Sequence, residues 1–257
     1  MRNSHGGVLA ETTTVAYLFL ISSCLFGGLS LLGLGVFLFF GSLELLPLRL
    51  SPHQAIAWDT FLSFVFFVQH RGMIRKSFRK RLEAVLPRLY HPAFYSAMSG
   101  VVLIILLVFW QQSDVAIWSA TGLVRWVIHG LYAAGIVGFW WGVVALKSFD
   151  ALGLRPLLAA LRVKSLTSMP LSIRGPYRFV RHPHYICMLV FGWACPHFTL
   201  DRLLFAILWS GWVIVGSILE ERDLVAEFGE SYRTYQQAVP RLVPWRKSRI
   251  CRLLSQN

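Results

Sequence analysis

Two short segments near the C-terminal end of the 257-residue sequence combine charged and aromatic side chains. The first is GPYRFVRHPHY at 175–185, and the second contains the adjacent carboxylates Glu220 and Glu221. Pro183 suits the first turn of a helix, whose free N–H groups would face an anionic group. A guanidinium, an imidazole, a helix N-terminus, two carboxylates and several tyrosines suit a ligand with both signs of charge. They equally suit one with ribose hydroxyls and an aromatic ring.

The sequence between the two segments predicts how they meet. Apolar residues fill 185–200 and 203–219, and a turn is expected between Pro196 and Arg202. At a rise of 1.5 Å per residue, each arm would span about 26 Å. Two antiparallel helices of equal length would therefore bring His182 back beside Glu220 and Glu221.

The composition predicts a membrane protein. Hydrophobic residues make up 56% of the chain and charged residues only 14%, against about 25% in a typical soluble domain, which excludes most soluble enzymes. Residues 15–40 hold no charged side chain over more than the ~20 positions needed to cross a bilayer. We expect an all-α, polytopic bundle of about five to six transmembrane helices, drawn from the stretches 15–40, 55–70, 94–110, 123–146, 185–200 and 203–219.

The basic residues predict an orientation. The net charge is +13, and three segments (71–93, 147–183 and the tail after Glu220) each hold seven of the 25 Lys and Arg residues. The positive-inside rule places these segments and both termini in the cytoplasm, in an inner membrane of bacterial type. We interpret the charge as topology and contact with membrane lipids. We expect no nucleic-acid partner and, since no C-x-x-C pair occurs, no metal.

The expected organisation is one integrated membrane domain in two parts. Residues 1–146 would supply the N-terminal transmembrane helices, and residues 147–257 the core with the charged segments. Within that core, interfacial amphipathic helices are predicted over 149–161 and 220–239.

The chain resembles a known superfamily in both halves. GPYRFVRHPHYICMLV and LEERDLVAEFGESYRTYQQAVPRLVP resemble the C-terminal signature of isoprenylcysteine carboxyl methyltransferases and related integral-membrane methyltransferases. The upstream segments WDTFLSFVFFVQHRGMIRKSFRK (58–80) and FDALGLRPL (149–157) resemble the methanethiol S-methyltransferase branch.

The resemblance implies S-adenosylmethionine as methyl donor, bound at the cytoplasmic rim. The residues expected to hold it are Tyr177, Arg181, His182, Pro183, Tyr185, Glu220, Tyr232 and Tyr235, partly through backbone groups. Glu220 and Glu221 are also expected to face the reaction, while Asp59, His70 and Asp150 are candidates to take a thiol proton. Gln69 and Gln236 would line the substrate pocket.

The expected reaction is attack of a small apolar thiolate on the donor methyl group, converting methanethiol to dimethyl sulfide. The thiol would enter from the lipid and the donor from the cytoplasm. Gln236 stands where family members commonly have an Arg that can meet a substrate carboxylate, which disfavours carboxylate acceptors. Two alternatives stay open: carboxyl or amine methylation of a lipid-like or isoprenylcysteine substrate, and a non-catalytic membrane accessory protein of the same fold.

Overall fold

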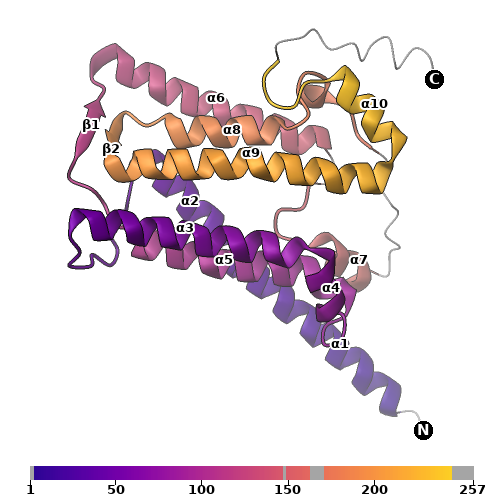
Figure 1. The fold of residues 1–257 in the computed structure, drawn as a ribbon. Helices are drawn as coiled ribbons and strands as arrows, with labels where there is room; N and C mark the ends of the chain where they lie inside the picture. The colour runs from indigo at the N-terminus through magenta and orange to yellow at the C-terminus, as the bar shows by residue number, and fades with distance from the viewer. Residues whose placement is uncertain (1–2, 147–148, 163–170, 245–257) are drawn as a thin grey trace. The chain divides into compact units, whose positions relative to one another are not determined.

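The computed structural model describes residues 3–146, 149–162 and 171–244, and helices make up most of this part of the chain (Figure 1). The chain divides into two compact units. One unit combines Met1–Gln112 with Asp150–Ser168, and the other combines Ser113–Phe149 with Met169–Asn257.

The first unit is built around a long N-terminal helical run that packs on α5. Gly27 in this run and Gly100 in α5 allow the two backbones to touch, because a Cβ atom on Gly100 would lie 2.4 Å from the carbonyl oxygen of Phe26. The elements are α1 (Asn3–Ser22), a π-helical turn (Ser23–Gly28), α2 (Leu29–Phe40), α3 (Pro52–Ile74), α4 (Lys76–Leu82), a 3-10 turn (Arg88–Tyr90), α5 (His91–Phe109) and α7 (Arg155–Leu161).

The second unit places α8 between α6 and α9, with which it packs (Figure 1). A two-stranded antiparallel ribbon, in which Trp118 lies opposite Phe198, is formed by the segment before α6 and the segment between α8 and α9. The elements are β1 (Ala116–Ser119), α6 (Gly122–Leu146), a 3-10 turn (Gly175–Arg178), α8 (Pro183–Trp193), β2 (His197–Thr199), α9 (Leu200–Phe228) and α10 (Glu230–Ala238).

Four helical runs in the described residues are long and apolar enough to cross a membrane: Thr13–Phe40, Arg88–Phe109, Gly122–Leu146 and Leu200–Phe228. The prediction of an all-α, polytopic helical bundle is confirmed. The expected stretch 55–70 lies in α3, which is longer than the stretch itself.

The two arms of the C-terminal hairpin differ in length, which corrects the expectation of equal arms. α8 has 11 residues, about 16 Å of helix, whereas α9 has 29. α8 ends at Trp193 because the chain then turns through Cys195 and Pro196 into β2, which pairs with β1. Alone, α8 is too short for a ~30 Å hydrocarbon core.

The helix expected over 149–161 is shorter in the structure. α7 begins only at Arg155, and Asp150 lies before it as a cap. The Asp150 carboxylate accepts the N–H groups of Leu154 at 2.9 Å and Arg155 at 2.8 Å, which satisfies two donors at the start of the helix. Gly153, with φ +65°, lets the chain turn between the acid and the helix.

The helix expected over 220–239 is two elements. α9 continues past Glu220 and Glu221 to Phe228 without a break, and Gly229, with φ +60°, separates it from α10. The apolar face recognised in the sequence folds back on itself, because Leu224, Val225 and Phe228 pack against the buried side chains Tyr232 and Tyr235.

Candidate functional site

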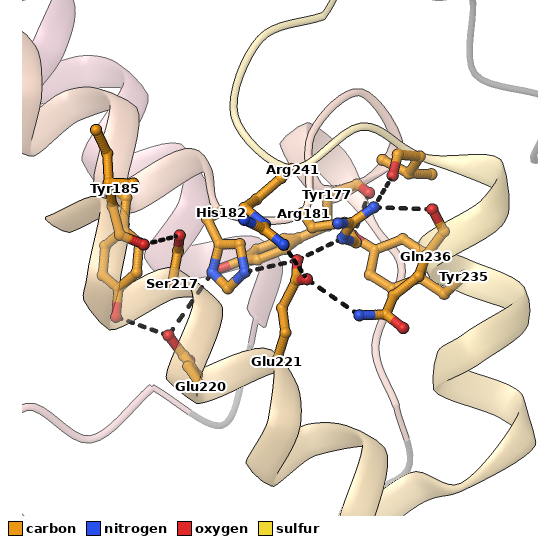
Figure 2. Close-up of polar contacts among 12 residues, drawn as sticks. Tyr177, Arg181, His182, Tyr185, Ser217, Glu220, Glu221, Tyr235, Gln236 and Arg241 are labelled. Atoms are coloured by element: carbon orange, nitrogen blue, oxygen red, sulfur yellow. Dashed lines mark hydrogen bonds and ion pairs between the residues drawn. The ribbon is translucent and has the colours of Figure 1, made fainter.

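The two charged segments meet in the second unit, as the sequence predicted (Figure 2). His182 directly precedes α8, and the two glutamates lie in the last part of α9. His182 Nε2 is 3.2 Å from Glu221 Oε1, and Nδ1 is 3.6 Å from Glu220 Oε2. The imidazole therefore lies between the two carboxylates.

Glu221 is the centre of a buried polar cluster. Its Oε1 accepts from Arg181 Nε at 2.7 Å and faces the His182 ring, and its Oε2 accepts from Gln236 Nε2 at 3.0 Å and Arg241 Nη2 at 3.2 Å. The Glu221 side chain is only 4% exposed. With two polar groups of the protein facing each oxygen, this carboxylate is already engaged and is not free to hold a ligand.

Arg181 ties the segment after α10 to the loop before α8. Its guanidinium donates to the carbonyl oxygens of Gln236 and Val239 as well as to Glu221. The backbone N–H groups of Arg181 and His182 donate to the carbonyls of Pro240 and Arg241 at 2.9 and 3.1 Å. These two N–H groups therefore hold the protein together instead of facing a ligand.

Glu220 lies in a different environment from its neighbour. Its side chain is 45% exposed, and its Oε2 accepts from the Tyr185 hydroxyl at 2.7 Å. The Tyr185 ring stacks on His182 with 5.1 Å between ring centroids and a 7° interplanar angle. Glu220 thus keeps acceptor capacity and is held in place by an aromatic hydroxyl.

A cavity of about 500 Å³ opens beside Glu220 within the second unit. Its wall is largely aromatic and aliphatic and contains a few charged side chains. The described residues that line it are Phe139, Leu146, Phe149, Leu171, Ser172, Tyr177, Arg181, His182, Pro183, His184, Tyr185, Met188, Glu220, Leu224, Glu227, Phe228, Tyr232 and Tyr235.

The tyrosines of α10 form one wall of this cavity. The Tyr235 hydroxyl donates to the carbonyl oxygen of Tyr177 at 2.7 Å, and the Tyr232 and Tyr235 rings meet edge to face at 5.7 Å. Burial raises the pKa of both hydroxyls well above the ordinary tyrosine value, so both stay protonated and neutral at physiological pH.

Comparisons with known proteins identify the family. The chain is 34% identical to methanethiol S-methyltransferase of Pseudomonas sp. strain GM41, over 90% of this chain and 87% of the relative. It is 35% identical to that of Pseudomonas deceptionensis, over 74% of this chain and 73% of the relative. The chain belongs to the methanethiol S-methyltransferase family. Nurim of Mus musculus is more distant, at 26% identity over 66% of this chain and 68% of Nurim. No family model and no solved structure matches the chain.

Every residue predicted to hold the donor in this methanethiol S-methyltransferase family member lines this same cavity. The two residues whose expected roles fit their places least are Glu221 and Gln236. Neither is among the described residues that line the cavity, and the Gln236 amide points to Glu221. Their predicted part in catalysis and substrate contact stays a prediction, while the geometry gives them a role in fixing Arg181.

The remaining predicted residues belong to the first unit, and each has a partner there. Asp59 accepts the N–H of Gln111 at 3.0 Å, and Asp150 caps α7. His70 contacts the Tyr95 hydroxyl at 2.7 Å, and Gln69 Nε2 is 2.8 Å from a methionine sulfur, Met73 Sδ. Their roles toward a thiol stay predictions.

Sequence reasoning missed several residues of the cavity, His184 above all. Its ring lies between Phe139, at 4.7 Å edge to face, and Phe149, at 5.1 Å stacked. The Tyr177 hydroxyl lies 2.9 Å from its Nδ1. A signal was available, because His184 stands between Pro183 and Tyr185 in the very segment from which the site was inferred.

Proposed function

We propose that the chain transfers a methyl group from S-adenosylmethionine to methanethiol at the cavity of the second unit, and so forms dimethyl sulfide. The observation that carries the proposal is the Glu220 carboxylate, which is half-exposed in a cavity with a largely aromatic and aliphatic wall. A carboxylate beside aromatic rings suits a cationic ligand such as a sulfonium. The family's name supports the acceptor.

The charged groups of the cavity match the rest of the donor. Glu220 and Glu227 would meet its positive groups. The hydroxyl groups of Tyr185 and Tyr232 offer partners for the ribose. Pro183 starts α8 and fixes the direction in which His182 and His184 leave the backbone.

The cavity wall supports a small, apolar acceptor. A volume of about 500 Å³ lies in the usual range for one cofactor-sized ligand, and a donor of that size leaves space only for a small second molecule. Leu171, Met188 and Leu224 offer that molecule apolar contacts. The arrangement does not favour a carboxylate acceptor: among the described residues that line the cavity, Arg181 is the only Lys or Arg, and its guanidinium is engaged by Glu221 and two carbonyl groups.

Methyl transfer requires mainly that the protein align the donor methyl group with the acceptor sulfur. The bound donor supplies an electrophilic methyl group, and the positive charge beside it is neutralised as the sulfide forms. A cavity that excludes water therefore helps, because water stabilises the charged reactants more than the transition state. The side chains around Glu220 would hold donor and acceptor in line, with Glu220 fixed by Tyr185.

We place the donor entrance at the cytoplasmic side of a bacterial inner membrane, with the thiol entering from the lipid and residues 147–257 as the catalytic core. The distribution of Lys and Arg supports this orientation. Fusion of a fluorescent protein that matures only in the cytoplasm to the C-terminus tests it: a dark fusion with intact methyl transfer would contradict the placement.

Headspace gas chromatography tests the function. Membranes that contain the chain, given methanethiol and S-adenosylmethionine, should release dimethyl sulfide. Glu220→Gln should weaken donor binding at least about tenfold in calorimetry in detergent, because loss of a partly desolvated charge contact costs more than about 1.4 kcal/mol. Glu230→Gln is the matched control, since Glu230 is exposed on α10 and does not line the cavity.

Two results would overturn the proposal. Methyl ester formation on an isoprenylcysteine analogue, without dimethyl sulfide from methanethiol, would indicate the carboxyl methyltransferase alternative. Donor binding without turnover of any thiol, carboxylate or amine would indicate an accessory protein.

A further inference from the structure

Two residues of the cavity, Tyr177 and His184, form a hydrogen-bonded pair. Tyr177 comes from the 3-10 turn before α8, and His184 is the second residue of α8. The Tyr177 hydroxyl lies 2.9 Å from His184 Nδ1, and both side chains line the cavity. The pair therefore places a hydroxyl group and an imidazole nitrogen in hydrogen-bond contact at the cavity wall.

The surroundings hold the imidazole in one orientation. Phe149 stacks on the ring and Phe139 meets it edge to face. On the α6 side, a Cβ atom on Gly142 would lie 2.8 Å from His184 Nε2, a distance that real Cβ contacts do not show. Gly142 thus leaves the space that the ring occupies, and Nδ1 is kept facing Tyr177.

Tyr177 is held just as firmly from the other side. Its carbonyl oxygen accepts the hydrogen bond from the buried Tyr235 hydroxyl, and its side chain is buried. Burial and the nearby Glu220 carboxylate raise the pKa of Tyr177 above the ordinary value. A lasting tyrosinate is therefore disfavoured, and the hydroxyl can take a proton only as it gives one up.

A thiol acceptor needs a group that accepts its proton. The thiolate is the nucleophile, and alkanethiols are weaker acids than the cysteine thiol, whose pKa is about 8.5. The other histidine lining the cavity, His182, faces the carboxylates of Glu221 and Glu220 with its Nε2 and Nδ1 atoms, so both of its ring nitrogens already have a partner. Tyr185 donates its hydroxyl proton to Glu220.

Resting on the proposed function, we propose that Tyr177 and His184 form a relay that takes up the thiol proton. As the acceptor S–H bond breaks and the new S–CH₃ bond forms, the thiol proton passes to Tyr177 Oη and the Tyr177 hydroxyl proton passes to His184 Nδ1. The bond between the donor sulfur and the methyl group breaks, and its electron pair stays on that sulfur. After the products leave, the imidazolium returns its proton through Tyr177 to water that enters the cavity, which both residues line, so each turnover gives one methyl sulfide, one demethylated donor and one proton.

In this relay Tyr177 is the catalytic residue that touches the thiol, and His184 acts through it. Both Tyr177→Phe and His184→Phe keep an aromatic ring in place, so the packing around Phe139 and Phe149 is retained. Tyr132→Phe is the matched control, because Tyr132 is a buried tyrosine of α6 that does not line the cavity.

The test compares acceptors of different acidity. With methanethiol at neutral pH, Tyr177→Phe and His184→Phe should each lower kcat about 100-fold or more, the usual contribution of a general base, with the donor Kd unchanged in calorimetry. With trifluoroethanethiol, a small thiol that is much more acidic, the loss should shrink to about threefold, since little proton transfer remains. Raising the pH should rescue both variants with methanethiol and leave Tyr132→Phe equal to the unsubstituted chain.

The outcomes separate the relay from the function itself. If the unsubstituted chain makes no methyl sulfide, the proposed function fails. If it is active but both variants lose the same factor with the two thiols at every pH, Tyr177 and His184 have a structural role and the relay is overturned. Full activity of either variant with methanethiol overturns it as well.

Discussion

The substitution Glu221→Gln tests the interpretation of the buried cluster. Glutamine keeps the shape of glutamate but replaces one oxygen by an NH₂ group. Each carboxylate oxygen of Glu221 accepts from at least one donor, Arg181 on Oε1 and Gln236 and Arg241 on Oε2, so the new NH₂ group opposes a donor whichever way the amide is turned. The Arg181 guanidinium also loses its counter-charge while it stays buried.

The burial of the partners sets the magnitude. The Arg181 side chain is 8% exposed and its Nε lies 2.7 Å from Glu221, and breaking such a buried pair costs about 3–5 kcal/mol. For a chain of this size, 1 kcal/mol corresponds to about 2–4 °C in Tm. We therefore expect Glu221→Gln to lower Tm by about 6–20 °C.

Arg241 supplies the control within the same cluster. It also contacts Glu221, at 3.2 Å, but its side chain is 36% exposed, and a pair that reaches solvent contributes about 1 kcal/mol or less. Arg241→Gln should therefore lower Tm by no more than about 4 °C.

Thermal unfolding in detergent, followed by circular dichroism at saturating and at zero S-adenosylmethionine, makes the comparison. Glu220→Gln, at a half-exposed carboxylate, should leave the Tm of the free protein within about 2 °C and reduce the stabilisation by the donor. The reasoning is refuted if Glu221→Gln melts with the unsubstituted chain, or if Arg241→Gln is the more damaging of the two.

Further substitutions test the packing and the cavity. Gly100→Ala should abolish stable folding of the first unit, because its Cβ would lie 2.4 Å from the Phe26 carbonyl oxygen; a cysteine-accessibility assay that finds native protection would contradict this. Tyr235→Phe should destabilise by about 1–3 kcal/mol, since it leaves the Tyr177 carbonyl without its hydroxyl donor, and chemical denaturation measures the loss. Because burial raises the pKa of Tyr235, the unfolded chain loses that proton first, so stability should fall as the pH rises above about 10; the drop should be smaller in Tyr235→Phe. Leu224→Ala should improve the kcat/KM of propanethiol relative to methanethiol about tenfold or more, because each methylene in an apolar pocket is worth about 1–3 kcal/mol, and an unchanged ratio in competition assays would show that Leu224 does not contact the acceptor.

The centre of the site could be predicted from the sequence because it depends on short local motifs and on the order of two antiparallel helices. An antiparallel return of the chain brings His182 to Glu220 and Glu221 even though α8 and α9 differ in length, since only the ends of the arms must coincide. The starting point of α8 at Pro183 followed from the missing N–H of proline. The long apolar stretches predicted the helices for the same reason, because a bilayer leaves few alternatives.

The parts that were not predicted depend on tertiary contacts. The early end of α8 reflects pairing of β2 with β1, two short segments that are distant in sequence. The different environments of Glu220 and Glu221 arise from the return of α10, which brings Gln236 and Arg241 to one carboxylate and not to its neighbour. His184 was passed over because nothing in its local sequence shows that Phe139 and Phe149 enclose its ring.

The cluster around Glu221 also bears on how the acceptor range can change by mutation. Because Arg181, His182, Gln236 and Arg241 share one carboxylate, their substitutions should be strongly non-additive, and few single changes there would survive selection. Leu171, Met188 and Leu224 line the cavity without belonging to that cluster, but Leu171 and Leu224 pack against the buried Tyr232 and Tyr235, so their effects should be coupled to each other. A library at Met188 should therefore alter the thiol preference with the least loss of folding, whereas libraries on the polar cluster should yield mainly inactive chains.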